Sequence, residues 1–175
     1  MERKELRLSG SGGQGLITAG IILAEAALYD GLNAVQSQSY GPEARGGASK
    51  SEVIISDSEI NYPKVNNCDI LLSLTQLSCD EYLSSLKPGG ILIIDDSIEL
   101  PPRDDIKVYK VPIIETATEK LKKPMVANII ALGVVYEVTK LVNKDSLEKA
   151  VLGRVPKGTE ALNKEALNAG FQLIK

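Results

Sequence analysis

LRLSGSGGQGLITAGIILAEAALY, residues 6–29, is the stretch of sequence that decides the fold. Its first four residues are typical of a short strand, residues 10–15 are rich in glycine, and residues 16–29 are apolar on nearly every face of a helix. Gly31 follows one residue later, where glycine commonly ends a helix. The stretch therefore predicts a strand, a tight turn and a buried helix.

Short apolar runs and turn residues alternate along the rest of the chain. Further strands are expected at 34–40, 51–56, 59–62, 70–74, 91–95 and 107–111. Helices are expected at 78–86, just after Ile113, at 126–142, from the capping box 145–148, and from Thr159. A turn is expected at Lys87-Pro88-Gly89-Gly90.

Two of these expectations fix the architecture. Alternating strands and helices imply right-handed crossovers and a parallel centre, whereas a hairpin of 51–56 with 59–62 would make the sheet mixed. No repeat or linker divides the chain. We expect one domain over residues 1–175, an α/β fold with three α/β/α layers, a mixed but mostly parallel sheet and a helical C-terminal part.

The composition limits the class of protein. The chain has 175 residues, 43% hydrophobic and 4% aromatic, so Ile, Leu, Val and Ala must build its core. Its net charge of −3 offers no basic field to nucleic acid. The longest apolar stretch, 125–136, is shorter than the roughly 20 residues of a membrane span, and residues 1–5 are unlike a signal peptide. We expect a cytoplasmic protein that binds neither nucleic acid nor a membrane.

The reactive side chains are few. Histidine is absent, and Cys68 and Cys79 stand far apart without Cys-x-x-Cys spacing. Histidine-based nucleophile pairs, iron–sulfur ligation, structural zinc and a disulfide framework therefore lack their residues. No catalytic residue and no metal ligand is predicted in this chain.

The glycine-rich turn admits more than one interpretation. Gly10, Gly12 and Gly15 match Gly-x-Gly-x-x-Gly, a pattern that leaves backbone amides exposed at a helix N-terminus. A dinucleotide site would also need an acid near the end of the second strand, but residues 33–40 contain none. The Gly-Lys-Ser/Thr of a nucleotide-triphosphate loop is also missing. A close-packed turn and a backbone anion site both remain open.

A second candidate site follows the second strand. Arg45, flanked by Gly46 and Gly47, would bring a guanidinium and bare amides close to an anion. In an open α/β sheet, ligands usually lie beyond the carboxyl ends of the strands. The alternative is that Glu43 and Arg45 are ordinary surface charges on a turn.

Several motifs in order resemble the gamma subunits of 2-oxoacid:ferredoxin oxidoreductases. They are the glycine turn with Gln14, the run Gln-Ser-Tyr-Gly-Pro-Glu-Ala-Arg-Gly-Gly at 38–47, the strand at 51–56, residues 60–63, and Met-Val-Ala-Asn at 125–128 before Leu132-Gly133. The resemblance covers most of the chain. The wording of the 38–47 run is most like 2-oxoglutarate enzymes, with a pyruvate or broad 2-oxoacid enzyme as the alternative.

The resemblance implies a multi-subunit enzyme that converts a 2-oxoacid, coenzyme A and ferredoxin into acyl-CoA, CO2 and reduced ferredoxin. Thiamine diphosphate, Mg2+ and 4Fe–4S clusters are expected on partner subunits, namely alpha, beta and in some enzymes delta. Coenzyme A is expected near the subunit interface. A stand-alone nucleotide- or anion-binding module and a non-catalytic assembly protein are the competing classes.

The residues expected to hold an anion, either a coenzyme A phosphate or a carboxylate of a neighbouring subunit, are Gly10, Gly12, Gly13, Gln14, Gly15, Arg45, Gly46 and Gly47. Asn128, on an apolar helix, is expected to cap a neighbouring segment or to lie in the subunit interface. Asp95 and Asp96 are expected at a solvated strand end.

Overall fold

The computed structural model describes residues 2–38 and 48–174. The strands are β1 (Lys4–Ser11), β2 (Asn33–Gln38), β3 (Ala48–Ser56), β4 (Cys68–Ser73), β5 (Leu86–Asp95) and β6 (Lys107–Val111). The helices are α1 (Leu16–Tyr29), α2 (Gln76–Tyr82), α3 (Ile113–Glu115), α4 (Ala127–Thr139), α5 (Lys144–Arg154) and α6 (Glu160–Gln172). Short turns of other helix types are η2 (Leu83–Ser85), η3 (Thr116–Lys120) and η4 (Pro124–Val126).

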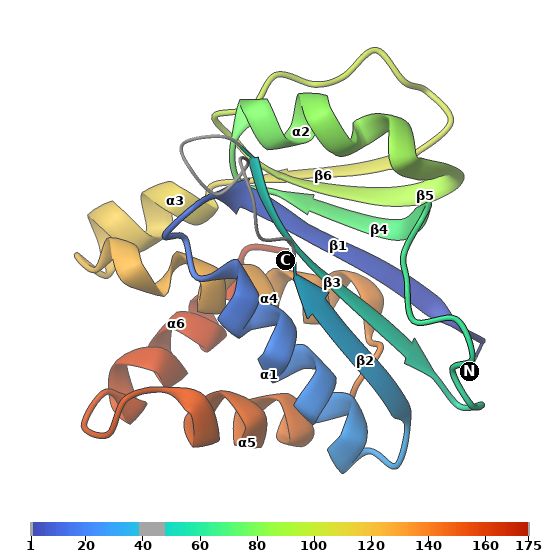
Figure 1. The fold of residues 1–175 in the computed structure, drawn as a ribbon. Helices are drawn as coiled ribbons and strands as arrows, with labels where there is room; N and C mark the ends of the chain where they lie inside the picture. Colours follow the sequence, from blue (N-terminus) through green and yellow to red (C-terminus); the bar gives the residue numbers. More distant parts are fainter. Residues whose placement is uncertain (1, 39–47, 175) are drawn as a thin grey trace.

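The strands form one mixed sheet in the order β2-β3-β1-β4-β5-β6 (Figure 1). β1, β4, β5 and β6 are parallel, and β3 runs antiparallel to both of its neighbours, β1 and β2. The predicted mixed, mostly parallel sheet is confirmed. Its antiparallel part, however, comes from β3 and not from a hairpin with residues 59–62.

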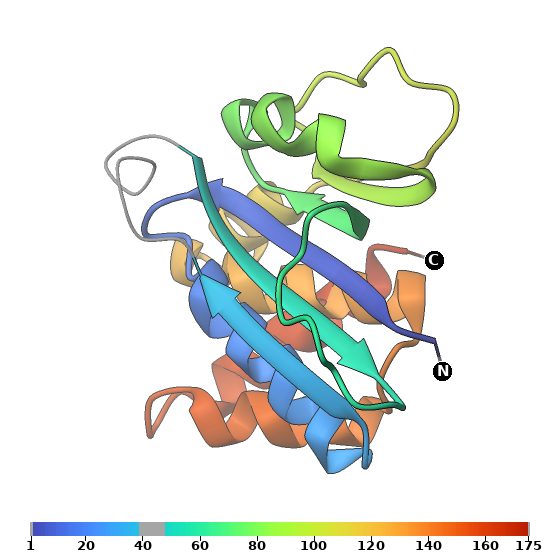
Figure 2. The same ribbon diagram turned by 45° about the vertical axis from the view of Figure 1, so that its right-hand side comes forward.

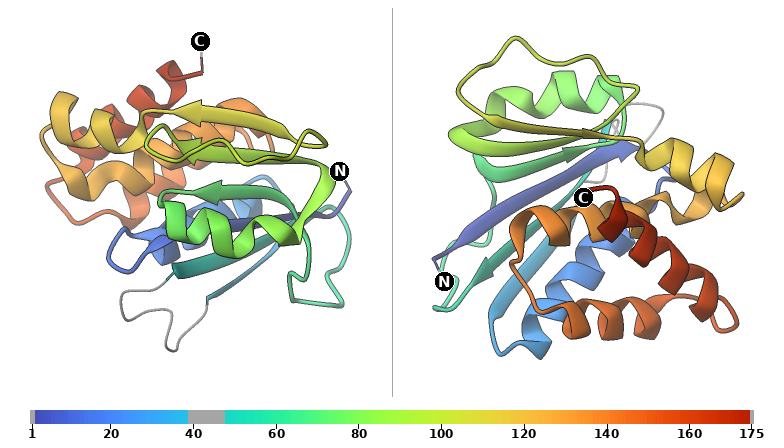
Figure 3. Two further views of the ribbon diagram at one scale, coloured as in Figure 1. Left: turned by 90° about the horizontal axis from the view of Figure 1, so that it is seen from above. Right: turned by 180° about the vertical axis from the view of Figure 1, so that it is seen from behind.

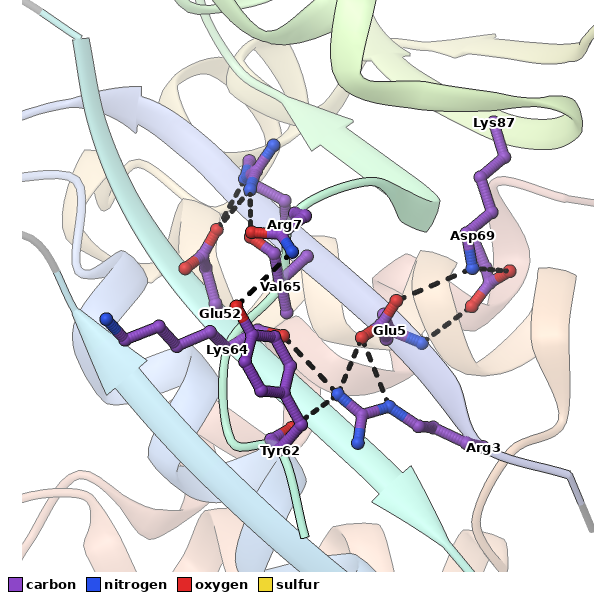
Figure 4. Close-up of polar contacts among 10 residues, drawn as sticks. Arg3, Glu5, Arg7, Glu52, Tyr62, Lys64, Val65, Asp69 and Lys87 are labelled. Carbon is purple, nitrogen blue, oxygen red and sulfur yellow. Dashed lines mark hydrogen bonds and ion pairs between the residues drawn. The ribbon is translucent and has the colours of Figure 1, made fainter. Parts of the chain in front are cut away.

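The predicted strand at 59–62 is wrong, because β3 has no free edge to pair with. β1 and β2 already occupy both sides of β3. Residues 57–67 instead pass over the face of the sheet away from α1 (Figure 2). Arg3 donates hydrogen bonds to the carbonyl oxygens of Tyr62 (2.6 Å) and Lys64 (3.3 Å) and so fixes the segment without strand pairing (Figure 4).

A buried ion pair lies under the same segment (Figure 4). Arg7 Nε donates to Glu52 Oε2 across the β1–β3 pair at 2.6 Å, and its Nη2 donates to the carbonyl oxygen of Val65 at 2.9 Å. Its Nη1 also donates to Ser85 Oγ. Because a buried guanidinium needs partners for its donors, these contacts tie the 57–67 segment and η2 to the sheet.

Two hydrophobic cores lie on opposite faces of the sheet and confirm the predicted three layers. The larger core is formed with α1, α4, α5 and α6, and the smaller one with α2 and part of the 57–67 segment. Figure 3 shows this unequal division, with most helices on one side of the sheet and α2 on the other. The C-terminal part from Ile113 onward is helical, as predicted. No helix within the described residues is long and apolar enough to cross a membrane.

Three local predictions need correction. Residues 87–90 are not a turn but part of β5, where the pairing with β4 shifts register and Gly89, at φ 79°, donates to the carbonyl oxygen of Asp105. α4 ends at Thr139 rather than at 142, because Lys140 adopts the left-handed conformation. The third correction concerns the start of α5.

The capping box at 145–148 does not form. α5 begins at Lys144 with Asn143 as its N-cap, and no side chain of its own caps it. Asp30, at the end of α1, supplies the carboxylate instead and accepts hydrogen bonds from the backbone amide (2.7 Å) and side chain (3.0 Å) of Asn143. A long-range partner has therefore replaced the local cap that the sequence suggested.

Candidate functional site

The glycine turn and the described residues that flank the second candidate motif reach the carboxyl edge of the sheet. The glycine turn follows the carboxyl end of β1, and Ala48, the first residue of β3, lies opposite Ser11. β2 ends at Gln38 toward the same edge. Ala48 therefore lies beside the glycine turn, and Gln38 lies at the same edge two strands away, where ligands are found in open α/β sheets. Arg45, Gly46 and Gly47 themselves lie outside the described residues.

The turn depends on glycine for two different reasons. Gly13 (φ 88°) and Gly15 (φ 76°) have left-handed backbones, which side chains disfavour. Gly10 has no such conformation, but a Cβ there would collide with Gln14 Oε1 and would lie 2.9 Å from Leu16 Cδ1. The close-packed interpretation of the turn is therefore correct for Gly10. It does not exclude an anion site, because Gly12 and Gly13 are exposed.

Gln14 folds back over the turn that contains it. Its Oε1 accepts a hydrogen bond from the backbone amide of Ser11 at 2.8 Å. The side chain thereby satisfies a turn donor and leaves its amide nitrogen directed elsewhere. Gln14 thus shapes the turn, a role that the sequence motif alone did not assign.

The N-terminus of α1 lies at this turn and is uncapped by side chains. Gly15 is the N-cap residue, no side chain within residues 2–38 and 48–174 accepts a hydrogen bond from the first turn, and the first turn contains no acidic residue. The first amides of a helix point outward and carry partial positive charge. The arrangement can therefore bind an oxyanion through backbone amides.

Asn128 anchors the turn from the other side. Its Nδ2 donates to the carbonyl oxygen of Gly15 at 3.0 Å, and its Oδ1 accepts from the amide of Ile129. Only 7% of the residue is exposed. The expectation that Asn128 caps a neighbouring segment is confirmed, and that segment is the glycine turn.

Asp95 corrects the expectation of a solvated strand end. Its side chain is buried and accepts hydrogen bonds from the amides of Ile114 (2.8 Å) and Ser97 (3.1 Å). It therefore holds the start of α3 against the end of β5. Asp96 is exposed, as expected. Two adjacent aspartates in the sequence do not indicate that the first is buried and the second exposed.

Two buried serines beneath the turn were missed by the sequence analysis. Ser9 of β1 and Ser73 of β4 lie side by side, with their hydroxyl oxygens 2.8 Å apart, and Ser9 also donates to the carbonyl oxygen of Leu72. Both are fully buried, so their hydrogen bonds keep the ends of two parallel strands in register. Serine is common at strand ends, so the sequence gives no distinctive signal for these two residues.

The topology adds a second argument against a dinucleotide site. In dinucleotide-binding folds the acid that holds the ribose ends a strand adjacent to the first one. Here β3 lies between β1 and β2. The end of β2 is therefore two strand spacings, about 10 Å, from β1. Position and residue type both disfavour a ribose contact.

Comparison with known proteins places this geometry in a family. Residues 5–173 match the family described as pyruvate ferredoxin/flavodoxin oxidoreductase. The chain belongs to this family. The 2-oxoglutarate synthase subunit KorC of Methanocaldococcus jannaschii is 52% identical over 99% of this chain and 95% of that protein. The expected family is therefore confirmed.

Solved structures of family members have the same fold. The gamma subunit of a keto/oxoacid ferredoxin oxidoreductase from Geobacter sulfurreducens has 50% identity, a TM-score of 0.91, and coverage of 99% of this chain and 97% of its own. A 2-oxoglutarate:ferredoxin oxidoreductase from Magnetococcus marinus, solved with 2-oxoglutarate, coenzyme A and succinyl-CoA bound, has a TM-score of 0.86 at 21% identity. It covers 99% of this chain and 31% of its own chain, and supports the fold only. The expected subunit type and the α/β fold are confirmed.

Proposed function

We propose that this chain is the gamma subunit of a 2-oxoglutarate:ferredoxin oxidoreductase. The enzyme would convert 2-oxoglutarate, coenzyme A and oxidised ferredoxin into succinyl-CoA, CO2 and reduced ferredoxin. The proposed substrate, 2-oxoglutarate, rests on the 52% identity to a 2-oxoglutarate synthase subunit along almost the whole chain. A pyruvate-type or broad 2-oxoacid enzyme is the alternative.

Alpha and beta subunits, with delta where present, would carry thiamine diphosphate, Mg2+ and the 4Fe–4S clusters. The placement of the cysteines supports this division, because Cys68 and Cys79 are both buried in the smaller hydrophobic core. Cluster ligation needs several thiolates around one centre. The gamma chain would then contribute binding and assembly rather than electron transfer.

The part proposed for this chain is to hold an anion at the shared interface. The amides of the glycine turn and the first turn of α1, together with Arg45, would bind a coenzyme A phosphate or a carboxylate of a neighbouring subunit. The uncapped N-terminus of α1 supports this proposal. One charged hydrogen bond contributes about 1.5–3 kcal/mol, which corresponds to roughly 10- to 150-fold in affinity.

Two assays of the complex, assembled from coexpressed subunits, test the proposal. The first compares turnover of 2-oxoglutarate, pyruvate and branched-chain 2-oxoacids. A preference for pyruvate would contradict the proposal that 2-oxoglutarate is the substrate. It also asks whether iron and thiamine diphosphate copurify. A stable monomer that binds NAD would overturn the enzyme assignment.

The second assay measures the KM for coenzyme A in Arg45→Ala, with Lys110→Ala as a control that removes an exposed charge from β6. We expect a KM raised about 10-fold or more in Arg45→Ala and unchanged in the control. An unchanged KM in a normally assembled Arg45→Ala complex would exclude coenzyme A as the anion. Failed assembly of that variant alone would favour a carboxylate of the neighbouring subunit.

A further inference from the structure

A second surface, next to the glycine turn, combines positive charge with an apolar hollow, and its lining includes Thr18 of α1 and Asn128. The hollow has a volume of about 310 Å3 and lies between the start of α4 and the connection from α5 to α6. Its apolar lining is made by Met125, Val126, Ile129, Val155, Pro156 and Leu162. Met125 is 74% exposed.

Lysines flank, in sequence, two of the segments that line this hollow. Lys120, Lys122 and Lys123 precede Met125 in the chain, and Lys157 follows Pro156. All four are exposed, and none of them has an ion-pair partner within residues 2–38 and 48–174. This concentration is unusual in a chain whose net charge is −3. We name the hollow and these four lysines the lysine-rimmed pocket.

Acidic neighbours do not cancel the charge of the pocket. Glu25 is already paired with Arg154, which also lines the hollow. Glu160 accepts a hydrogen bond from the amide of Gly158 at 2.6 Å and keeps its charge, so it offsets one of the four lysines only. Glu119 belongs to a different hollow, beside Asp96 and Glu115. The positive rim is therefore available to charges from outside the chain.

The backbone holds the lysines in place before any partner binds. Lys122 has φ 57°, and the turn that contains it is closed by hydrogen bonds from the amide of Leu121 to Thr116 and from the amide of Lys123 to Ala117. A fixed turn loses little conformational freedom on binding. Such preorganisation favours a built interface over a chance cluster of surface charge.

We infer that the lysine-rimmed pocket docks an acidic surface of a partner subunit, from which one apolar side chain enters the hollow beside Met125. The lysines would pair with carboxylates around that side chain, as a polar rim surrounds an apolar centre in stable interfaces. Transient electron-transfer contacts are small and wet, whereas permanent ones are more apolar. The exposed Met125 and the apolar hollow therefore favour a resident subunit over ferredoxin. The inference rests on the proposed complex.

The test compares three variants in the complex assembled from coexpressed subunits. Met125→Ser removes the apolar contact, and Lys123→Glu with Lys157→Glu reverses one charge next to each of the two lining segments. Lys64→Glu with Lys110→Glu is the matched control, since both are exposed lysines with no ion pair to any described residue and lie elsewhere in the fold. Circular dichroism of each purified chain checks that it is folded.

Sedimentation at increasing dilution and salt measures assembly. We expect the dissociation constant of this subunit to rise about tenfold or more in both pocket variants and to stay near the wild-type value in the control. Wild-type assembly should also weaken as salt rises from about 50 to about 300 mM, and less so in the charge-reversed variant. Unchanged assembly of both pocket variants would overturn the inference.

Two other outcomes would overturn it in favour of a different ligand. Intact assembly with a raised KM for ferredoxin would assign the pocket to the electron acceptor. Intact assembly with a raised KM for coenzyme A would assign it to a small anion. If the wild-type chain forms no complex with the subunits, the proposed function fails instead, so the two failures are distinguishable.

Discussion

The side-chain amide of Asn128 donates a hydrogen bond to the carbonyl oxygen of Gly15, 3.0 Å away and 113 residues distant in sequence. A Cβ on residue 15 would lie 2.5 Å from the same Nδ2 atom. Asn128 thus occupies the space that any side chain at position 15 would need. The start of α4 and the N-cap of α1 are consequently fixed to each other at the candidate site.

Gly15→Ala should therefore destabilise the protein more than Gly13→Ala. Both residues have positive φ, which costs an alanine about 1–2 kcal/mol. Gly13 has no atom of a described residue within 4 Å of its virtual Cβ, so it reports the backbone cost alone. The excess for Gly15→Ala, measured by urea unfolding, should shrink when Asn128→Ala is added. Equal costs for the two glycines would contradict the contact.

Asp30→Ala should cost more stability than Glu148→Ala. Asp30 accepts two hydrogen bonds from Asn143 and another from Ser146 Oγ, so it fixes the N-cap residue and first turn of α5 to the end of α1. Each such hydrogen bond typically contributes about 0.5–1.5 kcal/mol. Glu148 pairs only with exposed Lys164, a contact that contributes about 0–1 kcal/mol. Thermal unfolding of both variants checks this order of stability. A larger loss of stability in Glu148→Ala would indicate that the local capping box at 145–148 forms.

These two sites show what the sequence determines and what it leaves open. The helix at 16–29 was predicted at the residues where it is found, because apolar side chains and flanking glycines are local signals. Likewise the strand at 107–111 and the helix after Thr159 follow from local pattern. Partners chosen from distant parts of the chain, as Asp30 is for Asn143, have no local signal.

The errors arose where strand pairing decided the structure. Residues 59–62 have strand-like residues, but β3 was already paired on both sides. Residues 87–90 contain proline and glycines, but β4 holds them in β5 through a register shift. At the candidate site the motif indicates the glycines and Gln14, and a capping role is expected for Asn128, whereas the segment that Asn128 caps and the role of Ser9 required the fold. The contribution of Arg45 stays a prediction.

Gly133→Ala and Gly170→Ala should both destabilise the protein, because α4 and α6 cross in contact at these residues. A Cβ on Gly133 would lie 2.5 Å from the carbonyl oxygen of Leu167 and 2.9 Å from Gly170 Cα, and backbone cannot move aside easily. Overpacking of this kind costs about 1–3 kcal/mol. Gly153→Ala in α5 is the control, since its Cβ would meet nothing within 4 Å and alanine favours helix. Calorimetry should show lower Tm for the first two variants and an equal or higher Tm for the control.

The thiol of Cys68 should make the protein less stable at high pH. Burial raises the pKa of Cys68 from 9.0 to about 11, with the charge of Arg7 opposing the rise. Because the folded thiol keeps its proton more tightly than the unfolded one, its contribution to stability is complete below pH 9. It is lost as the pH rises from 9 through about 11, and two pKa units correspond to about 2.7 kcal/mol.

Comparison of the wild-type chain with Cys68→Ala isolates this contribution from other groups that titrate in the same range. The free energy of unfolding should fall more steeply between pH 8 and pH 10.5 in the wild type than in the variant. Burial raises the pKa of Cys79 as well, so both thiols should resist alkylation at pH 8 until the chain unfolds. Parallel pH profiles for the two proteins, or rapid labelling of the folded chain, would show that Cys68 is accessible to solvent and that the smaller core opens readily.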